Sequence, residues 1–231
     1  MVATVFIVSF MESMLISFFR GMVTPHKGKV IYVEGNVGAG KTEIMTAMKK
    51  CLTDKDYTVM LFSEETEFWQ HENILQDMCN RPGGRAAKCA FDALGPLRQF
   101  IRRAHFIEKC GSEYDYILLE RHATTTLEVF GADKAVRALF ETVHASFPVM
   151  DPPETTVYVK ASPGMCLERI ISRGRECERG MDFAYIKDID TKHGAMMLAR
   201  RSAGCTVVAV DCNRENIAAV AGDACAELLP A

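Results

Sequence analysis

The stretch VEGNVGAGKTEIM (Val33–Met45) decides the fold. Its glycines, lysine and threonine follow the spacing G-x-x-x-x-G-K-[ST], which is typical of a loop that binds phosphate groups through its backbone. An apolar, β-branched run at 29–33 precedes the loop, and apolar residues at helical spacing follow it between 44 and 52. Strand, loop and helix in this order are the context that such a loop requires. The stretch therefore predicts a nucleotide-binding loop at the end of a buried strand.

Each part of this loop has an expected role. Successive backbone N–H groups at the helix N-terminus bind phosphate oxygens. Lys41 reaches the β- and γ-phosphates, and the Thr42 hydroxyl coordinates Mg²⁺. We therefore expect ATP and Mg²⁺ at a loop formed by Gly35, Asn36, Val37, Gly38, Ala39, Gly40, Lys41 and Thr42. The pattern does not say which reaction follows, although the lack of an N-K-x-D sequence disfavours a guanine-reading switch.

Working outward, four further apolar runs alternate with helical patterns. The strands are expected at 58–65, 114–122, 155–163 and 205–211, and the helices at about 90–110, 123–146, 164–175, 183–201 and 214–228. This alternation predicts an α/β protein, a P-loop three-layer fold with a five-stranded parallel sheet covered by helices on both faces. Gly95-Pro96 predicts a kink or a late start in the first of these helices.

Size and composition are consistent with one domain. The chain has 231 residues, of which 48% are hydrophobic, enough for a single core over residues 28–231. The net charge of -3 offers no basic surface, so we expect no nucleic-acid polymer as partner. Nine cysteines, an odd number without any C-x-x-C pair, favour a reduced and cytoplasmic protein.

The N-terminal extension, residues 1–27, is of uncertain status. Residues 1–21 are apolar apart from a threonine, three serines, Glu12 and Arg20. A secretory signal would need a basic start and a small-residue cleavage site, and a membrane span would carry Glu12 near its centre. Three interpretations remain open. The segment is an extra helix or extension, a membrane or organelle-targeting segment, or the result of a start assigned too early, with Met22 as the working start.

Charged side chains stand where the expected strands end. Glu64 ends the second strand, and Glu120 and Arg121 end the third. Ligands bind parallel sheets at the carboxyl ends of their strands, so these groups should converge beside the phosphate loop. A carboxylate there can take a proton from an attacking hydroxyl, and an arginine can hold it ionised. A solvated acidic turn is the alternative for Glu64.

The stretch LERIISRGRECERG (167–180) carries three arginines on a helical pattern beside two glycines. An exposed basic helix face is the ordinary explanation. Arginines downstream of a phosphate loop also suit a lid that closes over a triphosphate and neutralises the transferring group. Glycines beside them permit a hinge. We expect a lid with Arg169, Arg173 and Arg175.

Together these segments resemble the deoxyribonucleoside kinase family of the deoxycytidine kinase and mitochondrial thymidine kinase type, including viral thymidine kinases. The resemblance covers about residues 28–215. It rests on VEGNVGAGKT, EETEFW, NILQDMCNRP, LLERH, the lid stretch VYVKASPGMCLERIISRGRECERG with YIKDIDTKH after it, and VDCNRENI. Phosphate loops are common, but the lid stretch together with Glu-Arg-His is specific.

The resemblance implies a role for each matching residue. Glu64 accepts the proton of a sugar 5′-hydroxyl, Arg121 pairs with that carboxylate, and Lys41 acts on the phosphates. Glu120 lies by the Mg²⁺ and its waters, and Glu178 accepts the sugar 3′-hydroxyl. The ATP contacts beyond the loop are Arg169, Arg173, Arg175 and Asn213, and the nucleoside pocket includes Trp69, Met78, Phe91, Asp92 and Gln99. The resemblance also implies a homodimer.

Several positions depart from the family pattern. Cys79 stands where a tyrosine contacts the 3′-hydroxyl. The base-reading Phe-Gln pair is best matched by Phe91 and Asp92, and an ionised aspartate cannot donate a hydrogen bond to a base. Gln99 lies two helical turns further on and is the alternative source of the missing amide. Thr126 stands where members that accept cytidine or purines place an aspartate, which tilts the expectation towards thymidine over deoxycytidine.

Two rival functions share these features. A nucleoside monophosphate kinase, such as a thymidylate kinase, has the same loop and a lid, but Glu64 would repel its anionic acceptor. A nucleotide-binding scaffold without turnover would be consistent with Cys79 and Asp92. The leading expectation is an ATP-dependent kinase whose partners are a deoxynucleoside and ATP.

Overall fold

A single parallel sheet organises the molecule. The computed structural model describes residues 28–64, 85–131, 134–144, 155–213 and 216–229. Its strands are β1 (Lys29–Gly35), β2 (Val59–Phe62), β3 (Tyr116–Glu120), β4 (Thr155–Lys160) and β5 (Thr206–Asp211). They are all parallel, in the order β2-β3-β1-β4-β5. The predicted α/β fold with a five-stranded parallel sheet is confirmed.

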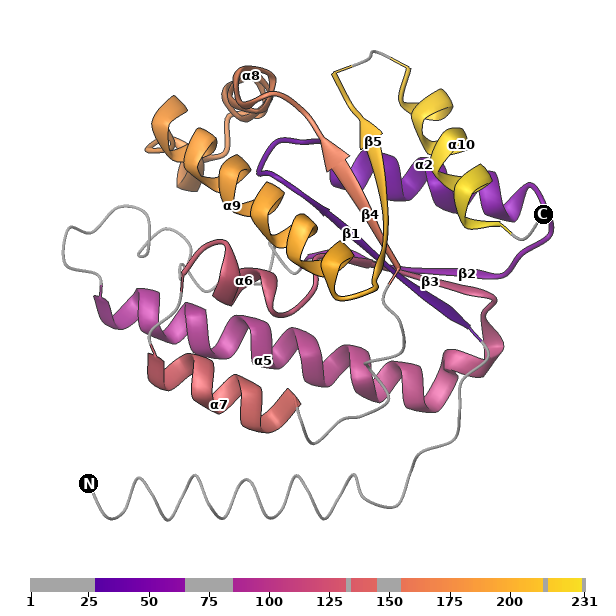
Figure 1. The fold of residues 1–231 in the computed structure, drawn as a ribbon, viewed down its shortest axis with the longest axis horizontal. Helices are drawn as coiled ribbons and strands as arrows, with labels where there is room; N and C mark the ends of the chain where they lie inside the picture. The colour runs from indigo at the N-terminus through magenta and orange to yellow at the C-terminus, as the bar shows by residue number, and fades with distance from the viewer. Residues whose placement is uncertain (1–27, 65–84, 132–133, 145–154, 214–215, 230–231) are drawn as a thin grey trace.

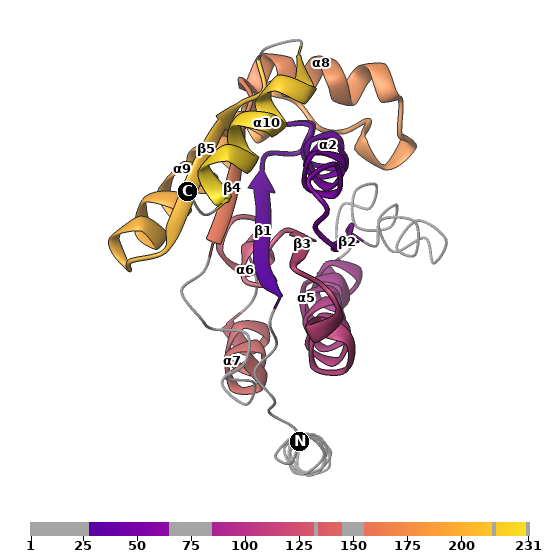
Figure 2. The same ribbon diagram turned by 90° about the vertical axis from the view of Figure 1, so that its right-hand side faces the viewer.

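Helices cover both faces of this sheet (Figures 1 and 2). They are α2 (Lys41–Thr53), α5 (Arg85–Cys110), α6 (Thr125–Glu128), α7 (Lys134–His144), α8 (Pro163–Arg173), α9 (Phe183–Ser202) and α10 (Ile217–Leu228), with short 3-10 turns at Gly111–Glu113 and Glu176–Glu178. Helices α2 and α10 lie on one face, and α5 and α7 lie on the other (Figure 2). The helical stretch expected over 123–146 divides into α6 and α7.

Both faces of the central strands β1 and β3 are buried. On β1, Ile31 and Val33 pack in the cluster that contains α2 and α10. Tyr32, which lies between them and points to the other face, packs in the cluster formed with α5 and α7. On β3, Leu118 joins the first cluster and Leu119 the second. Strands that are buried on both sides need apolar residues at every position, which is why they are continuous apolar runs in the sequence.

Helix α5 runs continuously through Gly95 and Pro96, so the late start expected there was wrong. A proline inside a helix removes one backbone hydrogen bond and crowds the preceding turn. Downstream, Phe100 and Ile107 are almost completely buried against the sheet. Tertiary packing of an apolar face outweighs local helix propensity, and this packing holds α5 in place.

In the part of the chain that the structure describes, no helix is both long enough and apolar enough to cross a bilayer. Six cysteines whose side chains the structure describes are free thiols: Cys51, Cys110, Cys166, Cys205, Cys212 and Cys225. The interpretations of residues 1–27 concern residues outside the described ranges.

Candidate active site

The phosphate loop connects β1 to α2 by a backbone path that requires glycine. Gly38 has φ +77° and Gly40 has φ +95°, both in the left-handed region. A Cβ atom on Gly38 would lie 2.5 Å from the carbonyl oxygen of Cys166, so the loop approaches α8 more closely than a side chain permits. Gly40 caps the N-terminus of α2 without a side-chain hydrogen bond. Backbone N–H groups at such a helix start attract anions.

Asn36 and Lys41 brace this loop from within. The Asn36 side chain accepts a hydrogen bond from the Val37 N–H at 2.8 Å and donates one to the Ile186 carbonyl on α9 at 2.9 Å. Lys41 Nζ donates to the Asn36 carbonyl at 3.0 Å. Burial lowers the pKa of Lys41 to about 8, and the charge of Arg121 adds to this effect. The loop therefore holds a buried ammonium group beside the expected phosphate position.

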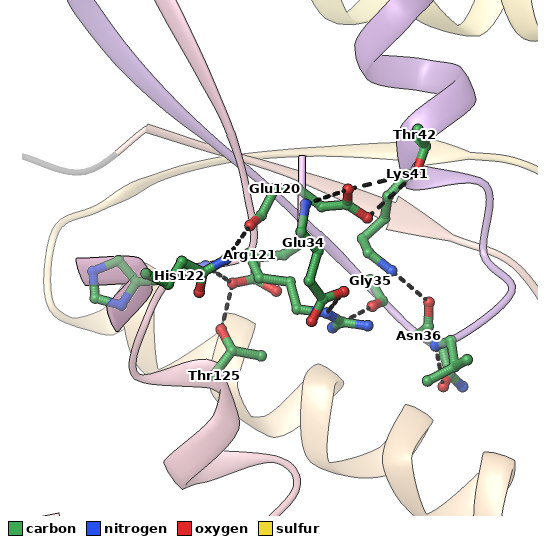
Figure 3. A network of polar contacts seen from close by, with 12 residues as sticks. Glu34, Gly35, Asn36, Lys41, Thr42, Glu120, Arg121, His122 and Thr125 are labelled. Carbon is green, nitrogen blue, oxygen red and sulfur yellow. Dashed lines mark hydrogen bonds and ion pairs between the residues drawn. The ribbon is translucent and has the colours of Figure 1, made fainter. Parts of the chain in front are cut away.

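Glu120, at the carboxyl end of β3, lies beside the start of α2. Its two carboxylate oxygens accept hydrogen bonds from the Thr42 hydroxyl at 3.4 and 3.5 Å (Figure 3). One of them also accepts a hydrogen bond from the Glu64 N–H at 3.1 Å. A hydroxyl and a carboxylate are hard oxygen ligands of the kind that Mg²⁺ takes. No group of three or more His, Cys, Asp or Glu side chains suited to a metal occurs among the described residues. Thr42 and Glu120 are the residues that would hold Mg²⁺.

Arg121 and Glu64 form an ion pair at the same edge of the sheet. Arg121 Nε lies 3.3 Å from Glu64 Oε2, and Arg121 Nη1 donates to the Gly35 carbonyl at 3.0 Å. The Arg121 guanidinium lies 5.1 Å from the centre of the Phe130 ring. Burial raises the pKa of the Glu64 carboxyl, but the charges of Arg121 and Lys41 outweigh it and lower the pKa. Glu64 is therefore kept as a carboxylate beside the phosphate loop.

The backbone at Arg121 is itself unusual. Its φ of +61° lies in the left-handed region, which side chains other than glycine rarely adopt. Two side chains of α5 hold this segment in place, because Arg103 donates to the carbonyls of both Glu120 and Arg121 and Gln99 donates to that of Glu120. A strained residue that its surroundings fix in this way is common at functional sites.

The lid arginines divide into two groups. Arg169 donates to the Ala39 carbonyl in the phosphate loop at 3.0 Å and to the Cys212 carbonyl after β5 at 2.8 Å. Arg173 makes a two-pronged contact with Glu178, at 2.7 and 2.5 Å, and Arg175 lies 3.6 Å from the same carboxylate. The structure thus brings Arg173, Arg175 and Glu178 together, although the sequence assigned them to two different ligands.

The remaining predicted residues lie at varied positions. Asn213 accepts from the Ser162 N–H and donates to Asp211, which joins the loops after β4 and β5 at the same sheet edge. Phe91 and Asp92 lie on α5, but their side chains are not among the described groups. Trp69 and Met78, and the departure at Cys79, lie outside the described residues. Their predicted contacts with a nucleoside stay predictions.

Sequence reasoning missed three buried polar residues around this site: Glu34, Arg103 and His193. Glu34 Oε1 accepts a hydrogen bond from the His122 N–H at 2.6 Å and another from the Thr125 hydroxyl (Figure 3). His193 Nε2 lies 3.3 Å from Arg121 Nη1. A carboxylate inside the buried strand β1 was a signal for Glu34, whereas nothing local marked Arg103 or His193.

A parallel sheet with a phosphate loop after its central strand and charged groups at the neighbouring strand ends defines a P-loop fold of the kinase type. The chain belongs to the deoxynucleoside kinase family, since the model of that family matches residues 31–225.

Individual relatives are distant. The chain is 22% identical to the deoxyguanosine kinase of Dictyostelium discoideum, over 80% of this chain and 64% of that protein. It is 23% identical to a thymidine kinase of Alcelaphine herpesvirus 1, over 78% of this chain and 36% of the viral protein. It is also 23% identical to the deoxycytidine kinase of Rattus norvegicus, over 74% of this chain and 76% of that protein. The chain thus spans less than two thirds of the first two relatives.

Proposed function

We propose that this protein transfers the γ-phosphoryl group of ATP to the 5′-hydroxyl of a deoxynucleoside. The observation that carries the proposal is the Glu64–Arg121 ion pair at the sheet edge that also holds the phosphate loop. Glu64 is tied through its N–H to Glu120, and Glu120 in turn contacts Thr42 of the loop. A carboxylate so placed can accept the proton of a hydroxyl that attacks a phosphate in the loop.

The remaining groups have complementary roles. The loop and Lys41 bind the phosphates of ATP, and Lys41 with the lid arginines stabilises negative charge on the transferring group. Arg121 keeps Glu64 ionised and oriented. Thr42 and Glu120 are the residues that would hold Mg²⁺, and the bound ion neutralises charge on the phosphates. The proton moves from the 5′-hydroxyl to Glu64 as the bond to phosphorus forms.

The charge of Glu64 favours a neutral acceptor. An ionised carboxylate beside the acceptor attracts and activates a hydroxyl, whereas it repels the phosphate of a nucleoside monophosphate. Relatives named for deoxyguanosine, thymidine and deoxycytidine support a nucleoside acceptor but differ in base. We propose thymidine as the leading acceptor. Thr126, on α6, stands where the resemblance to cytidine-accepting members implies an acid that accepts a hydrogen bond from the exocyclic amine of cytosine.

A direct assay tests the proposal. The purified chain is incubated with ATP, Mg²⁺ and, separately, thymidine, deoxycytidine, deoxyguanosine, deoxyadenosine and thymidine monophosphate. We expect thymidine to be phosphorylated faster than any of the other four compounds. Glu64→Gln should lower kcat by about 10²- to 10⁴-fold, the usual contribution of a general base. Glu113→Gln, at the opposite end of β3, is the matched control and should be as active as the parent.

Three outcomes would contradict the proposal in different ways. Phosphorylation of thymidine monophosphate alone would identify a monophosphate kinase. Binding of ATP without any product would favour a scaffold without turnover. An unimpaired Glu64→Gln variant would remove Glu64 as the base even if nucleosides are phosphorylated.

A further inference from the structure

His193 is a completely buried histidine on α9. Its Nδ1 lies 3.0 Å from the carbonyl oxygen of Ile189, and its Nε2 lies 3.3 Å from Arg121 Nη1. A carbonyl oxygen only accepts hydrogen bonds and a guanidinium only donates them. The proton must therefore sit on Nδ1, and the lone pair of Nε2 must face Arg121. Burial, together with the charge of Arg121, lowers the pKa of His193 to about 3, so the ring is neutral at physiological pH.

We propose that His193 is a positioning residue that aims the Arg121 guanidinium at Glu64. Arg121 Nη1 donates on one side to the Gly35 carbonyl and on the other to His193, while its Nε faces Glu64. The Phe130 ring lies against the guanidinium, and its edge meets the His193 ring at 6.3 Å between centres. Four groups thus fix the plane of the guanidinium, and His193 is the only side-chain hydrogen-bond acceptor among them apart from Glu64.

Helix α9 has the rigidity that this role requires. Ile186 lies seven residues before His193, two turns away on the same helix face. Its carbonyl accepts the hydrogen bond from Asn36 in the phosphate loop. Both residues are completely buried. One face of one helix therefore fixes the phosphate loop through Ile186 and the acceptor-side arginine through His193.

The surrounding charges do not replace this contact. The charged groups around Arg121, Glu64 and His193 are Glu34 on β1, Lys41 on α2, Arg103 on α5, Glu120 on β3 and Arg200 on α9. Glu34 Oε2 lies 3.9 Å from His193 Nε2, too far for a hydrogen bond, and accepts none from the described residues. Glu34 therefore acts on Arg121 through its charge, whereas the hydrogen bond to His193 orients the Arg121 guanidinium. Replacing His193 with a neutral residue that cannot accept this hydrogen bond changes the orientation of the Arg121 guanidinium and leaves the surrounding charges unchanged.

Two amide variants separate the two nitrogen atoms of the ring. The amide of glutamine reaches the position of Nε2, so His193→Gln keeps an acceptor for Arg121. The amide of asparagine reaches only the position of Nδ1, so His193→Asn keeps the contact with the Ile189 carbonyl and loses the one with Arg121. If His193 matters only through its hydrogen bond to the Ile189 carbonyl, asparagine should replace it better than glutamine. If His193 positions Arg121, only glutamine should replace it.

The kinetic consequence rests on the proposed function. With thymidine and ATP, His193→Asn should lower kcat by about 10- to 100-fold, as a misplaced catalytic group does, while KM for ATP changes less than about threefold. The acid limb of kcat/KM should move up by about one pH unit, because Glu64 loses the fixed Arg121 contact that holds its pKa down. His193→Gln should stay within about fivefold of the parent. The inference would be overturned if both variants fold and have the same kcat, or if His193→Asn has a higher kcat than His193→Gln.

A second measurement does not require turnover. NMR of ¹³C-labelled glutamate carboxyls follows the titration of Glu64, whose signal is assigned by its loss in Glu64→Gln. Glu64 should titrate at higher pH in His193→Asn than in the parent or His193→Gln. If no nucleoside is phosphorylated by the parent, the proposed function fails, and this titration still decides the role of His193. If His193→Asn does not fold, His193→Met takes its place, and an unshifted Glu64 signal in it would reject the inference.

Discussion

Two regions of this molecule hold arginines in ion pairs, the sheet edge at Arg121 and the predicted lid segment from Arg173 to Glu178, and they are built differently. Arg121, at the end of β3, has a side chain that is 5% exposed and is fixed by groups from several elements. In the lid, the side chains of Arg173 and Arg175 are 34% and 41% exposed. Their shared partner, Glu178, comes from the same short segment after α8.

The difference shows how the two regions should respond to a ligand. The sheet edge is preorganised, since its charges are buried and oriented before ATP arrives. The lid is held by ion pairs near solvent, which contribute little to stability and exchange readily. We therefore expect the lid arginines to exchange Glu178 for phosphate oxygens, while Arg121 keeps its partners. Changes at the sheet edge should affect stability and activity together, and changes in the lid should affect activity alone.

Lys41→Met should have the largest effect on activity. In the proposed function Lys41 binds the transferring phosphate, so the loss of this charged donor should lower kcat by about 10³-fold. The same change should stabilise the protein at pH 7. The pKa of Lys41 falls to about 8 in the folded protein, so the unfolded chain binds more protons between pH 8 and 10.5, and stability rises with pH there. Below pH 8 the cost of burying the charge is present in full.

Thermal unfolding between pH 6 and 10 measures this effect. At about 1.4 kcal/mol per pKa unit, less about 1 kcal/mol for the lost hydrogen bond to Asn36, the Met variant should gain roughly 2 kcal/mol at pH 7. The gain should shrink above pH 8. Lys49→Met, at an exposed position on the same helix, is the control and should behave as the parent. If Lys41→Met is no more stable than the parent at pH 7, burial of the Lys41 ammonium group does not destabilise the folded protein.

Arg121→Lys should have the next largest effect. Lysine keeps the charge but lacks the planar fork that reaches Glu64, Gly35 and His193 together. Misplacing a catalytic contact by about 1 Å costs about 10²-fold in rate. We expect a loss of kcat of this size and a lower Tm, because the buried carbonyl and imidazole acceptors lose their donor. Steady-state kinetics and calorimetry test it, with Arg102→Lys, exposed on α5, as control. Full activity in Arg121→Lys would mean that charge alone suffices at the sheet edge.

Arg173→Met should lower kcat/KM for ATP by one to two orders of magnitude, less than the loss of a sole donor, because Arg169 and Arg175 remain. Its Tm should stay within about 2 °C of the parent, since partly exposed ion pairs contribute at most about 1 kcal/mol. Kinetics with varied ATP and a thermal melt in the absence of ligand separate the two quantities. A melt lowered as far as that of Arg121→Lys would show that the lid is as fixed as the sheet edge.

The sequence was sufficient for the fold and for one side of the site. The strands are short apolar runs between helical patterns, so all five were recognisable. The strand-end rule placed Glu64 and Arg121 beside the phosphate loop. Local signals failed where tertiary packing decides. Helix α5 continues through Gly95-Pro96 because Phe100 and Ile107 anchor it in the core.

The missed polar residues share a different cause. Arg121 and His193 are 72 residues apart in the chain, and Glu34 and His122 are 88 apart. No period or spacing reports such a contact, because each partner lies in a different element. The residue type alone does not show whether a histidine is buried and accepts a hydrogen bond or is exposed to solvent. The pairing of Arg173 with Glu178 was missed although they are close in sequence, since charges so near a loop have many possible partners.

The smallest effect is expected at Arg179, in the same segment as the lid arginines. Arg179 lies 3.6 Å from Glu176, with side chains 74% and 63% exposed. Pairs exposed to this degree contribute from nothing to about 1 kcal/mol. The ion-pair partner of the Arg179 side chain is Glu176, whereas Arg173 and Arg175 share the Glu178 carboxylate. Arg179→Ala should therefore leave kcat/KM for ATP within about twofold and Tm within about 1 °C of the parent. Comparing Arg179→Ala with Arg173→Met tests whether ATP use depends on the placement of Arg173 or only on the total positive charge of the lid segment. If Arg179→Ala impairs ATP use as much as Arg173→Met, the lid acts as a diffuse positive surface, and the geometric distinction between Arg173 and its neighbours is wrong.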